Sequence, residues 1–311
     1  MIKADYSYKK IWTITYPVMI SLLMQDLIGM TDTAFLGRVG EVELGASALA
    51  GIYYLVIYII GFGFSVGAEI LIARLNGEGK YRQMGSVFYH GVAALLVMAA
   101  AMYILTTLLS PTLLRMFIQS DAIYEATMDY MRWRVFGFFF SFIGIMFRAF
   151  YMATTKTKIL TINSLVMVLA NVGLNYVLIF GKFGFPALGI AGAAIASTVS
   201  ELISVIFYVL YTRYATDFRK YGMFRREKYD FKVQRRIFRV SGWTMVQYFL
   251  SCGTWLFFFM AIEHLGERSL AVSNIVRNVS MLLYLFVSAY ATTGSAMVSN
   301  LMGTPGGADK V

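Results

Sequence analysis

The chain alternates between long apolar runs and short polar breaks. Eight apolar runs cover roughly residues 12–35, 46–73, 84–110, 122–153, 158–180, 189–212, 237–263 and 270–301. Each is long enough for the ~20 residues that a helix needs to cross a ~30 Å hydrocarbon core. The breaks between the runs carry charge, Gly or Pro, as turn segments should. The pattern therefore predicts an all-α, polytopic membrane protein.

Composition agrees with this fold class. Of the 311 residues 59% are apolar and only 14% are charged, whereas a soluble domain of this size needs more charge to cover its surface. The single cysteine, Cys252, lies inside an apolar run, so no disulfide framework is expected. A formal charge of +10 would suggest nucleic-acid binding in a soluble protein. Here the basic residues fall in short loops of one membrane face, and nucleic acid is not an expected partner.

The basic residues also predict the orientation. Loops on the side of the N-terminus hold 18 Lys and Arg residues, and the loops on the other side hold four, Arg38, Arg115, Lys182 and Arg268. By the positive-inside rule the N-terminus is cytoplasmic, and the expected location is the cell inner membrane. The first apolar run is too long for a signal peptide and lacks a small-residue cleavage site, so it is interpreted as the first membrane helix.

An internal repeat predicts the domain organisation. The segment GEVELGAS at 40–47 resembles GERSLAVS at 266–273, and a shift of 226 residues keeps further matches in register, such as Tyr58 with Tyr284. An even number of spans per copy makes the repeat parallel. We expect a six-helix transmembrane bundle at 1–212, a basic cytoplasmic linker at 213–236, and the first two helices of a second, repeated bundle at 237–311. A complete second copy would need about 450 residues by this spacing, so the chain is expected to be truncated.

Asp32 is the sharpest candidate for chemistry. It lies in QDLIGMTDTAFLG near the outer end of the first span. A carboxylate inside a membrane helix costs several kcal/mol unless it is paired, hydrated or protonated, and such residues usually take part in ion or proton movement. The alternative is an interfacial Asp that faces water or caps the end of the helix.

Other polar signals lie in the first and fifth spans. Pro17 removes one backbone hydrogen bond from the first span and favours a kink, unless it lies in the first helical turn, where proline is harmless. Asn171 and Asn175 are four residues apart and share one face of the fifth span. They could solvate an ion or hold helices together. The small residues of GIAGAAIAS at 189–197 are interpreted as helix packing only.

Enzyme motifs are absent from the sequence. There is no HExxH, GxSxG or Walker P-loop, and the two histidines, His90 and His264, lie far apart, so no enzyme activity, cofactor or histidine metal site is expected.

Three segments resemble the multidrug and toxic compound extrusion (MATE) family: YPVMISLLMQDLIGMTDTAFLGRVG, GFGFSVGAEILIARLNGEGK and ANVGLNYVLIFGKFGFPALGIAGAAIAS. The resemblance covers the chain to Gly303 and implies two six-helix bundles around a V-shaped cavity. It implies a secondary active antiporter that exports cationic or amphiphilic organic compounds in exchange for H+ or Na+.

The resemblance also implies roles for individual residues. Asp32 matches the carboxylate used for cation coupling, with Na+ at Asp32 as one form of the site. Pro17 matches the proline at which the first helix bends, and Asn171 with Asn175 matches the polar pair that contacts the same site. Some archaeal relatives have Asp at the second position, so Asn175 is a departure. The seventh span, SGWTMVQYFLSCGTWLF, lacks the glutamate that another branch uses.

Two alternatives stay open at this point. The first is a flippase for lipid-linked precursors, which resembles the same superfamily and would favour a strongly cationic cavity. The second is a non-functional fragment. The expected partners are an organic cation or amphiphile and the lipid bilayer, and the protein is expected to be monomeric.

Overall fold

A computed structural model describes residues 7–223, 228–263 and 267–307. Within these ranges the regular secondary structure is helical throughout. The elements in chain order are α1 (Tyr8–Leu36), α2 (Glu41–Gly77), α3 (Tyr81–Phe117), α4 (Asp121–Arg134), α5 (Gly137–Ala153), α6 (Lys158–Phe180), α7 (Gly189–Ala215), α8 (Phe231–Glu263) and α9 (Glu267–Gly303). The predicted all-α fold class is confirmed.

The apolar runs form the membrane-spanning helices. Five helices of the described part, α1, α2, α3, α6 and α7, are long and apolar enough to cross a membrane. The pair α4 and α5 meets the same test as one span that is bent by 52°. With this pair the helices before the linker give the six predicted spans. The two last predicted spans form α8 and α9, although several of their side chains lie outside the described residues.

The predicted span at 122–153 is bent, and it consists of two helices. Helix α4 ends at Arg134 and α5 begins at Gly137. A break frees backbone groups that lipid cannot satisfy, so it needs cover from neighbouring helices. Val135 and Gly137 are buried, and α4 and α5 both pack against α2 and α7. The bend thus lies within the bundle and turns the end of α4 toward α7.

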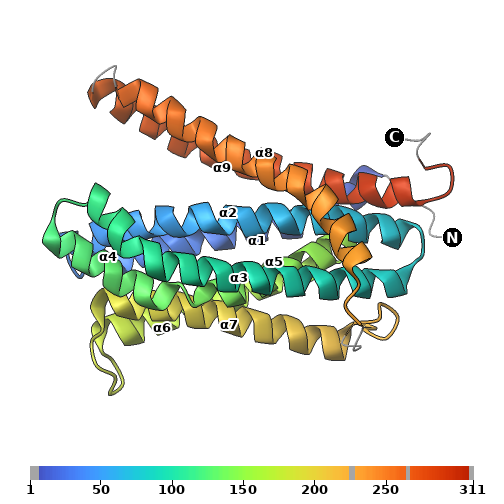
Figure 1. Cartoon of the computed structure of the whole chain (residues 1–311), viewed down its shortest axis with the longest axis horizontal. Coiled ribbons are helices and arrows are strands. Elements are labelled where there is room, and N and C mark those ends of the chain that lie inside the picture. The colour runs from blue at the N-terminus through green and yellow to red at the C-terminus, as the bar shows by residue number, and fades with distance from the viewer. Residues whose placement is uncertain (1–6, 224–227, 264–266, 308–311) are drawn as a thin grey trace.

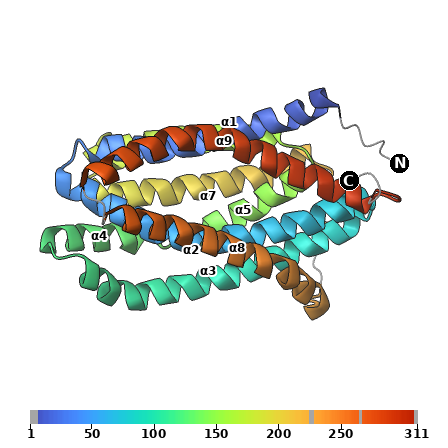
Figure 2. The same cartoon turned by 90° about the horizontal axis from the view of Figure 1, so that it is seen from above.

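Helix α2 lies at the centre of the arrangement. It packs against α3, α4 and α5 and also against α8 and α9, while α6 packs against both α1 and α7. Figures 1 and 2 show α8 and α9 as a pair that lies over α1 and α2. In Figure 1 the pair is close to the bundle at the end that carries both termini and tilts away at the opposite end.

The domain boundaries and the superposition of α8 and α9 on α1 and α2 stay predictions. Gly266 of the repeat, His264, and residues 224–227 of the predicted linker lie outside the described residues. Helix α8 begins at Phe231, six residues before the predicted start of its span, so part of the basic segment is helical.

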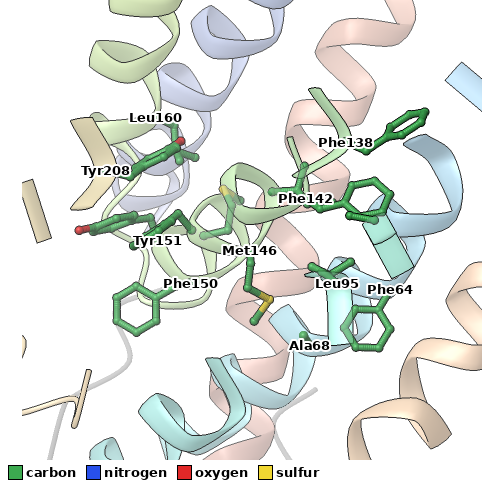
Figure 3. Packing of buried hydrophobic residues seen from close by; sticks show 14 of the residues in the cluster. Phe64, Ala68, Leu95, Phe138, Phe142, Met146, Phe150, Tyr151, Leu160 and Tyr208 are labelled. Carbon is green, nitrogen blue, oxygen red and sulfur yellow. The ribbon is translucent and has the colours of Figure 1, made fainter. Parts of the chain in front are cut away.

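Large apolar side chains fill the bundle around α5. Phe138, Phe142, Met146, Phe150 and Tyr151 of this helix are all fully buried. Figure 3 shows them packed against side chains of α2, α3, α6 and α7. Dense packing of this kind holds helices together in lipid, because the lipid tails are apolar and the hydrophobic effect does not drive helices to associate there.

Helix α8 docks on α2 through small residues. A Cβ atom added to Gly63 would lie 2.8 Å from the Cα of Met245, and one added to Gly67 would clash with Ser241. The close approach allows the Ser241 hydroxyl to donate to the Phe64 carbonyl at 2.9 Å. Glycine at these two positions therefore lets α8 approach α2 closely enough for this side-chain hydrogen bond to form.

Candidate functional site

Asp32 lies one turn before the end of α1 and points into the bundle. The end of the helix is capped at Gly37, whose N–H donates to the Thr33 carbonyl at 2.9 Å. Both carboxylate oxygens of Asp32 instead accept hydrogen bonds from α6 and α7. Asp32 therefore does not cap the end of α1, and it does not simply face water.

Three neutral side chains form a closed network around the Asp32 carboxylate. The Asn175 amide donates to Oδ1 at 2.5 Å, and the Ser197 hydroxyl donates to Oδ2 at 3.0 Å. The Asn175 amide also donates to Asn171 Oδ1 at 3.1 Å, and the Asn171 amide donates to the Ser197 hydroxyl at 3.2 Å. The structure therefore brings together Asp32, Asn171 and Asn175, which the sequence singled out.

The helical repeat explains how α6 supplies two of these groups. Asn171 and Asn175 are four residues apart and lie on one face, and both are fully buried. Buried amides need partners, and here the two amides bond to each other and to the site. They join α6 to both α1 and α7, so ion solvation and helix attachment are compatible roles for the same pair.

The Asn175 carbonyl oxygen has no hydrogen-bond partner although it is buried. The amide group itself faces the carboxylate, and the opposite amide orientation would bring two oxygens together. The oxygens that these side chains carry, one carboxylate, two amide oxygens and one hydroxyl, are of the kind that suits a hard cation such as Na+. Among the described residues no cluster of three or more His, Cys, Asp and Glu side chains could bind a metal ion. A cation here would use one carboxylate and neutral oxygens.

Pro17 lies well inside α1 and not in its first turn, because the helix begins at Tyr8. Its backbone carbonyl accepts a hydrogen bond from the Thr161 hydroxyl at 2.8 Å, and the Ile14 carbonyl accepts one from Thr157 at 2.9 Å. One turn beyond Pro17, the Ser21 and Ser164 hydroxyls are 2.7 Å apart. The N-terminal half of α1 is thus fastened to the start of α6.

Ser197 was missed from the sequence because it ends the small-residue segment GIAGAAIAS. That segment does pack closely, since a Cβ atom on Gly192 would lie 2.7 Å from the Leu178 backbone. The same close approach brings α7 near enough for Ser197 to reach both α1 and α6. A hydroxyl that ends such a segment, on the face with Gly189 and Ala193, is the signal that could have indicated its role.

A second charged group in the bundle was not predicted. Arg134, at the end of α4, donates to Glu201 of α7 through two hydrogen bonds of 2.9 and 2.6 Å. Arg134 is 9% exposed. Glu201 lies one helical turn beyond Ser197, so the ion pair and the Asp32 network occupy one face of α7. Arg134 is also near enough to Asp32 for their charges to interact.

Aromatic and small residues complete the surroundings of this ion pair. The Arg134 guanidinium lies over the Tyr54 ring, 3.8 Å from its centroid, and the Tyr54 hydroxyl donates to Glu201 at 3.4 Å. A Cβ atom on Gly137 would lie 2.6 Å from the Glu201 carboxylate. Glycine at the start of α5 therefore leaves the space that the ion pair occupies.

The sequence matches a known family model and several known proteins. Residues 17–177 match the family model MatE, which is more than half of the chain. The chain is 25% identical over 294 residues to the "Probable multidrug resistance protein NorM" of Neisseria meningitidis serogroup B, covering 94% of this chain and 64% of that protein. It is 27% identical over 280 residues to the protein of the same name from Thermotoga maritima, covering 89% and 59%. The chain thus spans less than two thirds of these relatives.

Solved structures show the same fold. A MOP superfamily transporter from Pyrococcus furiosus, described as having a binding pocket of reversed polarity, aligns with a TM-score of 0.84 at 20% identity. The alignment covers 95% of this chain and 65% of that transporter. The Vibrio cholerae MATE transporter VcmN in its bent form aligns with a TM-score of 0.83 at 19% identity, with 95% and 66% covered.

The helical fold and the candidate membrane spans agree with the match of the family model. The chain belongs to the MatE family, the multidrug and toxic compound extrusion family, whose members are membrane transporters and not enzymes.

Proposed function

We propose that this chain belongs to a secondary active antiporter that exports cationic or amphiphilic organic compounds in exchange for H+ or Na+. The observation that carries the proposal is the Asp32 carboxylate, whose hydrogen-bond partners in the described structure are all neutral. A charged carboxylate with neutral partners binds a cation more readily than one with a fixed ion pair. Relatives of the chain carry the name multidrug resistance protein, which supports the class of cargo.

The coupling follows from charge balance at this network. A cation that binds Asp32 neutralises it and changes the attraction of the bundle for a cationic cargo. The coupling energy that such exchange needs is typically ~1–3 kcal/mol, which one charge change in a partly dry cavity supplies. The Asn175 carbonyl and the Ser197 hydroxyl would serve as oxygen ligands for Na+, and they would face a carboxyl group after protonation.

Helix α1 is the element through which the site would act on the fold. Its inner half is held by Thr157 and Thr161. Pro17 has no N–H to donate, so the Thr13 carbonyl loses its helical partner and α1 can bend there at low cost. Loss or gain of the bonds from α6 and α7 to Asp32 would then move the outer half of α1 against a fixed inner half.

The flippase alternative is less well supported by the charges. A flippase for lipid-linked precursors would favour a strongly cationic cavity. In this bundle Arg134 is neutralised by Glu201. Export of organic compounds is therefore the better interpretation of the interior, and we propose that the protein acts as a monomer.

Transport assays with an imposed ion gradient test the proposal. The protein is expressed from its complete reading frame and reconstituted in proteoliposomes. Asp32→Asn should abolish ion-driven export while the protein stays folded and inserted. The matched control is Asp26→Asn, on the same helix but at an exposed position, which should transport normally. Undiminished export by the Asp32 variant would show that the coupling site lies elsewhere.

The proposed orientation places the N-terminus in the cytoplasm and the protein in the cell inner membrane. Single cysteines introduced into a variant without Cys252 test this. Lys228→Cys, in the segment before α8, should not react with an impermeant reagent added to intact cells. Phe183→Cys, which is exposed in the loop after α6, should react. The reverse labelling pattern would refute the orientation.

A further inference from the structure

Four basic side chains lie on the exposed face at the start of α8. They are Lys232, Arg235, Arg236 and Arg239, whose spacings of three and four residues place them on one side of the helix. Within the described ranges 7–223, 228–263 and 267–307, none of these side chains forms a hydrogen bond or an ion pair within 4.0 Å. Exposed cations without acidic partners create a positive potential that attracts negatively charged groups.

The opposite face of the same turns packs on the bundle. Gln234, Ile237 and Ser241 are buried, and their spacings of three and four residues place them on one side of α8. The bond from the Ser241 hydroxyl to the Phe64 carbonyl fixes the rotation of the helix on α2. The four cations therefore face away from the protein.

Hydrogen bonds also hold the start of α8 beside α3. The Asp230 backbone N–H donates to Nε2 of His90, a fully buried residue of α3, at 2.8 Å. His90 Nδ1 in turn donates to the Ser86 carbonyl at 2.8 Å. Oδ1 of Asp230 accepts from the Lys232 backbone N–H at 2.8 Å. The carboxylate that directly precedes the helix is thus bonded to its backbone and leaves the basic side chains without a counter-charge.

The first turns of α8 have the character of an interfacial helix. In Figure 1 the start of α8 runs steeply to the long axis of the bundle, at the end that carries both termini. Phe231 and Phe238 are seven residues apart, so they share a flank beside the cations, and they are 78% and 44% exposed. Helices that lie in the surface of a bilayer combine a basic face with aromatic or aliphatic side chains in this way.

The internal repeat indicates that the cations stay exposed in the complete transporter. The shift of 226 residues places Lys9 and Lys10 of α1 at the positions of Arg235 and Arg236. Both lysines are exposed, although α6, α7 and α9 pack against α1. Further helices of a second bundle that cover α8 as the first bundle covers α1 would leave this basic face free.

We infer that Lys232, Arg235, Arg236 and Arg239 bind the phosphate groups of anionic phospholipids, so that the start of α8 is a site for the headgroups of lipids such as phosphatidylglycerol. Guanidinium groups bind phosphate through two parallel hydrogen bonds, which suits the three arginines to this ligand. The inference does not depend on the proposed export function. The competing explanation is that these cations only fix the orientation of the chain and have no preference among lipids.

A tryptophan reporter beside the basic face tests the inference. Phe231→Trp is made in the protein from its complete reading frame, and the same protein without this substitution gives the background fluorescence. Both are reconstituted in vesicles of phosphatidylcholine and phosphatidylglycerol, in which either one lipid or the other is brominated near the headgroup end of an acyl chain. Quenching of the reporter by each brominated lipid gives the preference of the site for phosphatidylglycerol.

The reporter protein should prefer phosphatidylglycerol by about fivefold or more, roughly the effect of one cation at an anionic surface. Replacing Arg235, Arg236 and Arg239 by Gln should reduce the preference to less than about twofold. These side chains are exposed, so the variant should fold, and thermal unfolding in detergent checks this.

The matched control removes three other charges. Lys9→Gln, Lys10→Gln and Arg82→Gln are combined, because these residues are also exposed, lie on the same predicted membrane face and belong to α1 and α3. This variant should keep the preference of the reporter protein. An equal loss in both triple variants would show a general attraction to the basic face of the protein and would overturn the site on α8.

Salt and free phosphate provide two tests that need no charge substitution. In the reporter protein the preference should fall by half or more at about 1 M salt, where charges are screened beyond about 3 Å. Inorganic phosphate in place of chloride at equal ionic strength should leave it unchanged. A preference that resists salt, or one that inorganic phosphate abolishes, would contradict the binding of lipid headgroups.

Discussion

Two carboxylates of the bundle lie beside neighbouring turns of α7: Asp32 of α1 bonds to Ser197, and Glu201 follows Ser197 by one turn. Glu201 is held by an arginine through two hydrogen bonds, and the side chains of the pair are 11% and 16% exposed. Asp32 is bonded to an amide and a hydroxyl that carry no charge. The same small region therefore contains one carboxylate with a permanent counter-ion and one without.

The difference indicates a division of roles. A fixed ion pair resists exchange, because removal of either member leaves the other charge buried and unpaired. A carboxylate with neutral donors is held in position by them, yet its charge can still be balanced by a mobile cation. We interpret Glu201 and Arg134 as the part of the bundle that fixes the bend between α4 and α5, and Asp32 as the part that responds to ions.

The largest expected effect is the loss of stability when the ion pair between Arg134 and Glu201 is broken. Glu201→Gln leaves the Arg134 guanidinium buried without its counter-ion and should lower the stability of the protein by about 3–5 kcal/mol. Thermal unfolding in detergent measures the change. The double variant Arg134→Met with Glu201→Gln should recover most of the loss, because no buried charge remains. A double variant as unstable as the single variant would contradict the account.

A smaller effect should follow from crowding the same pair. Gly137→Ala places a methyl group 2.6 Å from the Glu201 carboxylate and should cost about 1–3 kcal/mol of stability. Gly144→Ala is the matched control on the same helix, since a Cβ atom there meets nothing within 4 Å. The control should be neutral or slightly stabilising, because alanine favours helices over glycine. Equal effects at the two positions would show that the space around the pair does not matter.

The contribution of a neutral hydrogen-bond donor to the Asp32 site is tested at Ser197. Ser197→Ala removes one donor from the Asp32 carboxylate, and a hydrogen bond to a charged group is worth about 1.5–3 kcal/mol. The concentration of the coupling ion at half-maximal export should therefore shift by about tenfold or more. Ser200→Ala is the control, because its hydroxyl bonds the Ser197 carbonyl and not Asp32. An unchanged ion dependence in Ser197→Ala would remove Ser197 from the site.

The smallest effect concerns a carboxylate in the loop after α2. Lys80 and Arg74 hold the pKa of Glu78 below its usual value of 4.5, chiefly through the hydrogen bond from Lys80. A lowered pKa in the folded state gives stability that is present above pH 4.5 and is lost as the pH falls through the folded-state pKa. Glu78→Gln should therefore cost less than about 1 kcal/mol near pH 7, and the cost should shrink as the pH falls below 4.5. A loss that stays the same size as the pH is lowered through the acid range would contradict this assignment.

Much of the fold was predictable because a bilayer imposes strong constraints on sequence. Long apolar runs predicted the helices, and the bend within the fourth run was missed. The residues around it, Val135 and Phe136, are apolar, and no proline indicates the break. The bend depends on tertiary contacts at Arg134 and Gly137, which a local pattern does not contain.

The candidate site was predictable in part for a similar reason. Asp32, Asn171 and Asn175 are conspicuous as polar residues in apolar helices, and the four-residue spacing places the two amides on one face. Ser197 has a small side chain in a segment that also has a packing role. Arg134 and Glu201 are 67 residues apart, so their pairing depends on how α4 meets α7 and cannot be read from spacing.

The central claim is that a cation and the cargo compete through Asp32. The most direct measurement uses the cationic dye rhodamine 123 as the cargo. Its binding to the purified transporter is measured over a series of pH values and, separately, of Na+ concentrations. One-for-one competition predicts that the Kd for the dye rises about tenfold for each tenfold increase in the coupling ion above its own Kd. In Asp32→Asn the Kd should be constant within twofold across both series. An Asp32→Asn protein whose dye binding keeps the ion dependence of the wild type would contradict the account.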